Sequence, residues 1–356
     1  MMLVEEGKLS LGDPVSKFLK VPATWSKITI RHLLTHTSGL GDYPEKFSLQ
    51  KDYSEEELLK MVTAQTLDFE PGEKWAYSNL GYLTLGIVIH KVTGQFYGDF
   101  LQKRIFEKLG MNSTRIINEA DIIPNRAAGY RLEKGELKNQ EWVSSSLNTT
   151  ADGSLYFTIE DMAKWDEALE KQTLLGADSF KQMWTPVELN DGGHASYGFG
   201  WSLEKNALGH RLIEHGGAWQ GFATYIGRHP EEHLSVVVLC NRAGANATYI
   251  ANTVAGFFVP GLAPPHRSTT KIDPVILQSY AGEYRLGDRL NVKMAAVGDH
   301  LETIWLGQKL FLTPESETLF FEEDSDRTVR FIRARGGRVT AAIISVPEEL
   351  TLRRLP

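Results

Sequence analysis

The chain has 356 residues, 42% hydrophobic and 23% charged, which is the composition of an ordinary globular protein. Its 38 basic and 45 acidic residues give a formal charge of −7, and no basic run stands out, so a nucleic acid is not expected as a partner. Its apolar runs fall short of the roughly 20 residues that span a bilayer, so we expect no transmembrane helix. The one cysteine, Cys240, excludes a disulfide within the chain and gives no clue to its compartment.

The chain opens on an apolar stretch, 1–4, followed by acidic residues and Gly7. This pattern predicts a short helix that stops at Gly7, without a side chain to cap its first N–H groups. Because so short a helix is marginal alone, we interpret it as the last turns of a longer buried helix. The opening has no basic segment typical of a signal peptide, and the cellular location stays open.

Two helices follow in chain order. The segment "SEEELLKMV" has Ser54 as its N-cap and Glu57 in position to complete a capping box. The apolar run 80–92 ends at Gly94 and predicts a buried helix.

Tyr77, Ser78 and Asn79 lie on the turn that enters this buried helix. One interpretation makes Asn79 an N-cap and Tyr77 a packing residue. The other places a phenol and a carboxamide together at a loop–helix junction that faces a cleft. The segment alone leaves both open.

The middle of the chain combines a helix with strands. "TIEDMAKWDEAL" predicts a helix capped by Thr158, with Asp161 three residues later. Three β-branched segments separated by short turns then predict an antiparallel meander: "HRLIEHGG", "GFATYIGRHP" and "LSVVVLCN".

His215, Gly216 and Gly217 stand at the predicted end of the first of these strands. Paired glycines weaken a strand, so they usually mark a bulge or a place where something approaches the backbone closely. A turn with a solvated histidine is the alternative.

The proline-rich stretch 259–274 predicts a linker between two bodies. We therefore expect a mixed α/β domain over 1–262, a linker over 263–273 and a second domain over 274–356. Eight short alternating runs within this last segment predict a small up-and-down antiparallel β-barrel.

The motifs, in this order, closely resemble the serine β-lactamase and penicillin-binding-protein-like hydrolases, which include class C β-lactamases, DD-peptidases, D-aminopeptidases and family VIII esterases. The resemblance runs from Met1 to about Leu262. It implies an antiparallel sheet flanked by helices plus an all-helical lobe, and the C-terminal body is similar to the lipocalin-like domain of several members. The matching segments are "LVEEGKLSLGDPVSKFL", "ITIRHLLTHTSGL", "FEPGEKWAYSNLGYLTLG", "IFEKLGMNST", "DMAKW", "YGFGW" and "HGGAWQGF".

Three motifs carry the chemistry in that family, and the resemblance implies two of them here. Tyr77-Ser78-Asn79 matches Tyr-x-Asn, and His215-Gly216-Gly217 matches His-x-Gly, the alternative to Lys-Thr-Gly. The Ser-x-x-Lys motif, which supplies the nucleophile, would lie about ten residues before Met1. We therefore expect the chain to begin after its nucleophile, and we expect no nucleophile within it.

Ser-x-x-Lys does occur elsewhere in the chain. None of these serines begins a buried apolar helix, the setting that would bring both side chains to one face, so we do not expect them to act. The three pairs are Ser48/Lys51, Ser202/Lys205 and Ser268/Lys271.

The resemblance also implies roles for the site residues. A serine hydroxyl needs a base with a lowered pKa, and Tyr77 would share that work and pass the proton to the leaving group. Asn79 would orient the substrate amide, and His215 would hold a polar or carboxylate end of the substrate. The N–H of Ala218, just beyond Gly216 and Gly217, would form part of the oxyanion hole.

Metal chemistry is the other hydrolytic option. His32 and His36 are four residues apart, as are His229 and His233, but His-Glu-x-x-His is absent and no third ligand suggests itself. We expect helix hydrogen bonds for the first pair and no metal or other cofactor.

The sequence therefore predicts a serine hydrolase that acts through an acyl-enzyme on amide or ester bonds of small molecules or short peptides, and is inactive or nearly so without its nucleophile. The alternative is a non-catalytic ligand-binding or regulatory protein. Because the family's N-terminal strands would be missing, the strand at 234–240 is expected to be an open edge. It would be covered by a partner chain, such as a second copy, or would leave a sheet of about three strands with poor solubility.

Overall fold

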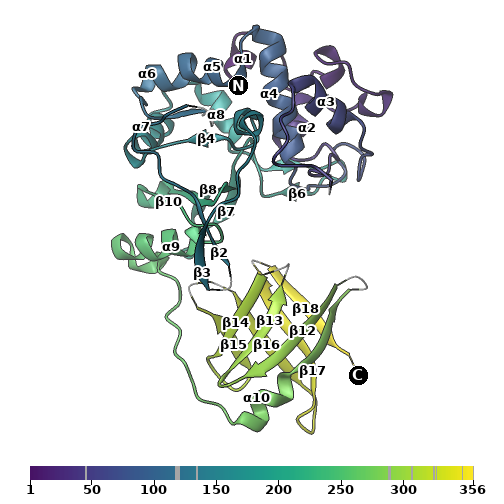
Figure 1. Cartoon of the computed structure of the whole chain (residues 1–356), viewed down its shortest axis with the longest axis vertical. Helices are drawn as coiled ribbons and strands as arrows, with labels where there is room; N and C mark the ends of the chain where they lie inside the picture. Colours follow the sequence, from purple (N-terminus) through teal and green to yellow (C-terminus); the bar gives the residue numbers. More distant parts are fainter. Residues whose placement is uncertain are drawn as a thin grey trace. The chain divides into compact units, whose positions relative to one another are not determined.

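The computed structural model describes residues 1–44, 46–116, 121–133, 135–287, 290–305, 308–323, 325, 327–346 and 348–355, with only the backbone at 148, 149, 308, 346 and 348. The chain divides into two compact units, Met1–Ala251 and Asn252–Pro356 (Figure 1). Each has a hydrophobic core of its own. Residues 264–273 contain no helix or strand, and the predicted domain limits stay a prediction. In the described part we find no helix of the length and hydropathy that a bilayer crossing requires.

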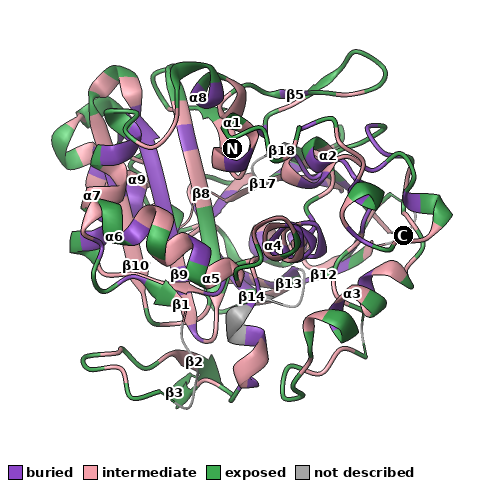
Figure 2. Cartoon of the chain, turned by 90° about the horizontal axis from the view of Figure 1, so that it is seen from above, coloured by how far each residue is buried: buried purple, intermediate pink, exposed green. Residues whose placement is uncertain are grey.

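Helix α4 (Asn79–Thr93) is the centre of a helical lobe in the first unit, and seven of its 15 residues are buried (Figure 2). It packs against α2 (Ile30–Leu34) and α3 (Glu55–Thr63). The interpretation of Asn79 as N-cap is wrong, because the Ser78 hydroxyl accepts the N–H of Gly81 and Asn79 is already helical. This frees the Asn79 side chain from capping. The helix ends at Gly94, whose φ of 67° favours glycine.

The predicted caps of the other two helices are present. The Ser54–Glu57 capping box begins α3, and Thr158 caps α7 (Ile159–Glu170). Asp161 does not complete a box; its carboxylate accepts the N–H of Ser113 instead, which ties a loop to the helix. The other α-helices described in this unit are α1 (Met2–Glu5), α5 (Tyr97–Leu101), α6 (Glu107–Leu109) and α8 (Ala177–Met183), with a π-helical segment, Gln102–Phe106, between α5 and α6. Helix α9 (Ala247–Phe258) runs across the boundary between the units.

The main sheet of the first unit is antiparallel, in the order β10-β9-β8-β7. The expectation of about three strands is wrong for the described chain, because Ser202–Lys205 adds a fourth strand beside the meander. Its strands are β7 (Ser202–Lys205), β8 (Arg211–Trp219), β9 (Phe222–His229) and β10 (Leu234–Cys240). Three two-stranded sheets accompany it: β1 (Arg115–Ile116) with β4 (Leu155–Tyr156), β2 (Tyr130–Glu133) with β3 (Glu136–Asn139), and β5 (Val187–Glu188) with β6 (His194–Ala195).

The second unit contains the predicted eight-stranded antiparallel barrel, which closes where its first and last strands pair. Helix α10 (Pro274–Tyr280) packs against the barrel, with the Tyr280 ring 4.1 Å from that of Phe331 between centroids. The strands are β11 (Gly282–Leu286), β12 (Leu290–Val297), β13 (His300–Trp305), β14 (Gln308–Pro314), β15 (Leu319–Glu322), β16 (Thr328–Arg333), β17 (Val339–Val346) and β18 (Glu348–Arg354). The predicted fold class is confirmed.

Candidate active site

Tyr77 and Asn79 are positioned by the turn that starts α4. The Ser78 N–H donates to Nδ1 of His36 at 3.1 Å, and the Ser78 hydroxyl donates to the carbonyl of Gly41 at 2.7 Å. The Tyr77 ring packs on the His36 imidazole with 4.2 Å between centroids. Ser78 thus caps the helix and anchors the two side chains that flank it.

His215 projects from β8 toward this turn. It lies within the strand, not at its end as predicted, because the pairing with β9 continues through both glycines to Trp219. The ring centroids of His215 and Tyr77 are 6.1 Å apart. Two predicted site residues from distant parts of the sequence therefore face the same space.

A hydrogen-bonded relay links this imidazole back to the turn of α4. The Tyr197 hydroxyl lies 2.9 Å from Nε2 of His215 and 3.2 Å from Nε2 of His36. At one end Nδ1 of His36 accepts a backbone N–H, and at the other Nδ1 of His215 is 2.6 Å from the carbonyl of Gly216.

The two backbone groups at the ends assign the proton positions in the relay. Nδ1 of His36 must accept, so its Nε2–H donates to Tyr197. The Tyr197 hydroxyl then donates to Nε2 of His215, whose Nδ1–H donates to the carbonyl of Gly216. Both imidazoles are neutral in this arrangement.

The pKa values of both histidines agree with neutral rings. Burial lowers the pKa of His36 to about 3, with the nearby His215 acting in the same direction, and burial also lowers the pKa of His215. Because both ring nitrogens of His215 are engaged within the protein, it would have to give up a hydrogen bond to hold a substrate carboxylate. The role predicted for it stays a prediction.

The environment of Tyr77 differs from the expectation of a lowered pKa. Burial raises the pKa of Tyr77, and the carboxylates of Asp152 and Asp42 raise it further. No cation of the described chain opposes them there. With the described residues, the Tyr77 phenol is neutral and suited to donate a proton.

Asn79 is oriented by a carboxylate that the sequence analysis missed. Its Nδ2 lies 3.3 and 3.2 Å from the two carboxylate oxygens of Asp42. Because an ionised carboxylate only accepts hydrogen bonds, the amide nitrogen must face Asp42. The Asn79 carbonyl oxygen is then the atom that can receive an N–H from a ligand.

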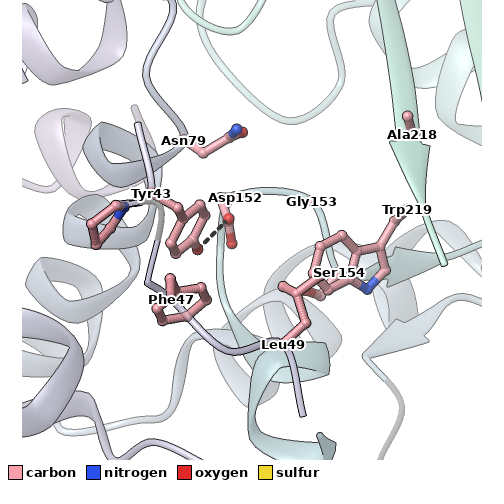
Figure 3. Close-up of a pocket in the computed structure, with 10 residues that line it drawn as sticks. Tyr43, Phe47, Leu49, Asn79, Asp152, Gly153, Ser154, Ala218 and Trp219 are labelled. Carbon is pink, nitrogen blue, oxygen red and sulfur yellow. Dashed lines mark hydrogen bonds between the residues drawn. The ribbon is translucent and has the colours of Figure 1, made fainter. Parts of the chain in front are cut away.

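An open pocket of about 350 Å³ adjoins these residues. Figure 3 shows Asp152 between Tyr43 and Trp219, with Asn79 and Ala218 on neighbouring segments. Among the predicted site residues, Asn79 and Ala218 line this pocket. Its full lining is Tyr43, Pro44, Phe47, Leu49, Asn79, Asp152, Gly153, Ser154, Ala218 and Trp219.

The two glycines after His215 have different surroundings. A Cβ on Gly217 would lie 2.5 Å from the Thr224 hydroxyl oxygen on the paired strand, whereas a Cβ on Gly216 would meet only the Thr224 carbonyl, at 3.8 Å. Close packing between strands therefore explains Gly217, while Gly216 leaves its face of β8 open.

His32 and His36, the first of the two histidine pairs considered as metal ligands, make other contacts. Nδ1 of His32 accepts the N–H of Thr29 in a capping box at the start of α2, and His36 belongs to the relay. The described residues contain no group of three side chains arranged to hold a metal ion.

None of the Ser-x-x-Lys serines lies at a helix start. Ser202 is in the strand β7, and Ser48 and Ser268 are outside helices and strands.

The sequence analysis missed Tyr197, His36 as part of the site, Asp42 and Asp152. A signal for two of them was present: His36 and Tyr197 belong to the segments "ITIRHLLTHTSGL" and "YGFGW", which carried the resemblance. No pattern pointed to Asp42 or Asp152, because an aspartate in a loop is ordinary.

The antiparallel sheet, the helical lobe and a Tyr-x-Asn turn facing a His-Gly-Gly strand define a hydrolase fold of the penicillin-binding-protein type. A family model described as Beta-lactamase matches residues 1–257. The chain belongs to the β-lactamase family, as the resemblance implied.

Its relatives agree with this placement. The chain is 31% identical to penicillin-binding protein 4* of Bacillus subtilis (strain 168), over 90% of this chain and 76% of that protein. It is 27% identical to a D-aminopeptidase of Gluconobacter oxydans (strain 621H), over 78% of this chain but only 53% of that protein.

Solved structures extend the likeness to the whole chain. An octameric penicillin-binding protein homologue from Pyrococcus abyssi is 26% identical, with a TM-score of 0.68, and the match covers 99% of this chain and 84% of that one. D-amino acid amidase from Ochrobactrum anthropi SV3 is 25% identical, with a TM-score of 0.57 over 67% of this chain and 70% of that one. The family and these relatives support a function of the serine hydrolase type.

Proposed function

We propose that the protein is a serine hydrolase that acts through an acyl-enzyme on amide or ester bonds, as a peptidase or esterase more than as an efficient β-lactamase. The single observation that carries the proposal is the approach of Tyr77 to His215, 6.1 Å between ring centroids, beside a pocket lined by Asn79 and Ala218. The D-aminopeptidase and the D-amino acid amidase among its relatives support amide bonds as targets.

Each side chain of the site has a proposed role in catalysis or binding. The neutral Tyr77 phenol donates a proton to the leaving group, the Asn79 carbonyl receives a substrate N–H, and the Ala218 N–H contributes to the oxyanion hole. The relay holds His215 neutral, so it forms an uncharged wall of the site. This disfavours tight binding of a substrate carboxylate, so the proposed role of His215 is to hold a neutral polar end of the substrate.

The nucleophile is proposed to come from a Ser-x-x-Lys motif outside this sequence, so this chain by itself is expected to be inactive or nearly so. The test incubates it with nitrocefin and a nitrophenyl ester, beside the longer chain read from the DNA upstream of the Met1 codon. We expect turnover only from the longer chain, blocked by a covalent serine reagent and reduced by Tyr77→Phe by about 100-fold.

Two results would contradict this proposal. Serine-reagent-sensitive turnover by the present chain would mean that one of its own serines is the nucleophile. An in-frame stop just upstream of Met1, with no turnover but binding of substrate analogues, would favour the non-catalytic binding protein.

A further inference from the structure

The pocket next to the site contains an acidic group that the proposed chemistry does not use. Oδ2 of Asp152 accepts a hydrogen bond from the Tyr43 hydroxyl at 2.7 Å. Oδ1 of the same carboxyl group is buried and has no hydrogen-bond partner among the described residues. A hydrogen bond with the Thr150 side chain also favours the ionised form of Asp152. An ionised carboxylate can accept several hydrogen bonds, however, and Oδ1 still lacks one.

No positive charge of the described chain balances this group. Asp152 forms no ion pair among the described residues. Asp42, whose charge also raises the pKa of Asp152, receives its hydrogen bonds from the Asn79 amide and the Tyr43 backbone N–H. Burying a carboxylate without a cation is costly, and the cost appears as a raised pKa of Asp152, caused by burial. A positively charged ligand in the pocket would remove that cost.

Apart from the polar side chains of Asn79 and Ser154, the rest of the pocket is mostly apolar. Tyr43 and Phe47 stack with 4.5 Å between ring centroids, and Leu49 and Trp219 complete the wall (Figure 3). Aromatic faces favour a neighbouring ammonium as well as an apolar side chain. The pocket thus offers one negative group within a hydrophobic surround.

The pocket is also continuous with the proposed catalytic residues. Asn79 and Ala218 line it, and the carboxylates of Asp152 and Asp42 both act on Tyr77. A ligand that fills the pocket is therefore close to the atoms that would orient a scissile amide.

We propose that this pocket is a subsite for a free ammonium group next to an apolar side chain, so that the substrates are amides or esters of hydrophobic amino acids with an unblocked amino group. The inference rests on the proposed function, because the pocket receives a substrate only if the neighbouring residues act on one. It goes further by naming the charged group that the substrate carries and the residue that selects it, Asp152.

The test measures binding to the present chain by calorimetry, so that it needs no turnover. Three probes are compared, each as both enantiomers where one exists: phenylalaninamide, its N-acetyl derivative, and 3-phenylpropanamide, which lacks the amino group. We expect phenylalaninamide to bind about tenfold more tightly than the two neutral probes, because only it brings a cation to Asp152.

The variant Asp152→Asn keeps the shape and removes the charge. It is expected to reduce the preference for the free amine to about twofold or less, while the affinity for the neutral probes changes little. Asp178→Asn, on the exposed first turn of α8, is the matched control and should keep the full preference. Circular dichroism verifies that each variant is folded. The comparison of the three probes on the wild-type chain tests the inference even if a variant does not fold.

Several results would overturn the inference: no binding of phenylalaninamide, equal binding of the acetylated probe, or an unchanged preference in Asp152→Asn. Its failure is distinguishable from that of the proposed function. If the longer chain turns over esters but shows no preference for free amines, only the subsite proposal is contradicted. If the longer chain binds free amines selectively but shows no turnover, only the catalytic proposal is contradicted.

Discussion

The relay of His36, Tyr197 and His215 determines the character of the site at the scale of single residues. Each of its four hydrogen bonds has a donor and an acceptor assigned by a backbone group at one end or the other. A buried network of this kind is stabilising only while all its members are paired.

Removing the Tyr197 hydroxyl, at the centre of the relay, should therefore lower the stability of the fold. Tyr197→Phe leaves Nε2 of the buried His36 and Nε2 of the half-buried His215 without their partner. We expect the free energy of unfolding to fall by about 1–3 kcal/mol. Urea unfolding measures it, with Tyr130→Phe, a tyrosine outside the relay, as the control. A loss no larger than that of the control would mean that the relay does not stabilise the fold.

The lowered pKa values of the two histidines predict how stability depends on pH. Above about pH 6.5 both are neutral in the folded and the unfolded chain. Below it the unfolded chain takes up protons that the folded chain refuses, so stability is lost as the pH falls toward about 3, the pKa of His36.

His36→Asn tests this dependence and keeps a residue type that tolerates the left-handed backbone, φ 57°, at this position. Between pH 6.5 and 4 the slope of unfolding free energy against pH should become smaller by up to one proton, about 1.4 kcal/mol per pH unit. An unchanged slope would contradict the prediction that, in this pH range, His36 binds a proton in the unfolded chain and not in the folded one.

At the scale of elements, the contact between α4 and the loop that carries Asp152 positions the proposed subsite. A Cβ on Gly86, in the middle of α4, would lie 2.5 Å from the Cβ of Ala151. Helix and loop thus touch at a place where only glycine fits.

Gly86→Ala should force the loop away from the helix. We expect a destabilisation of about 1–3 kcal/mol together with a weaker preference for free amines. Gly81→Ala is a matched control in the same helix, since its Cβ would meet only Leu33, with its carbonyl nearest at an ordinary 3.5 Å. It should be neutral or slightly stabilising. Equal stabilities of the two variants would contradict the close contact.

At the scale of the whole molecule, the two units have separate cores, and the barrel closes without strands from the first unit. Closure removes the unpaired edges that make an isolated sheet prone to aggregate. In the main sheet of the first unit, by contrast, β10 is one of the two edge strands of the described chain, with β7 at the other edge. Whether a partner chain covers β10 stays a prediction.

The separate core predicts that residues 266–356 fold alone. We expect a cooperative thermal transition and a β-type circular dichroism spectrum, and we expect a fragment that begins at 282 to be less stable by several kcal/mol, because it loses the buried Leu277 and Tyr280 of α10. An unfolded 266–356 fragment would show that the barrel depends on the first unit.

The sequence by itself determined the family and those elements that carry a strong local signal. Caps at Ser54 and Thr158, the apolar run of α4 and the eight alternating runs of the barrel are local signals, and local signals predict local structure. The expectation that Tyr77 and His215 lie in one site came from the resemblance, since nothing in either segment alone requires them to be close in space.

Only the tertiary structure decided the electrostatics of the site. Asp42 and Asp152 reach it from loops whose spacing carries no pattern. The segment of Tyr197 was part of the resemblance, but only the fold brings its hydroxyl to His215, whose protonation depends on it. The physical reason is that a pKa and a tautomer depend on burial and on neighbours in space. Neither the pKa nor the tautomer can be predicted from the order of residues along the chain.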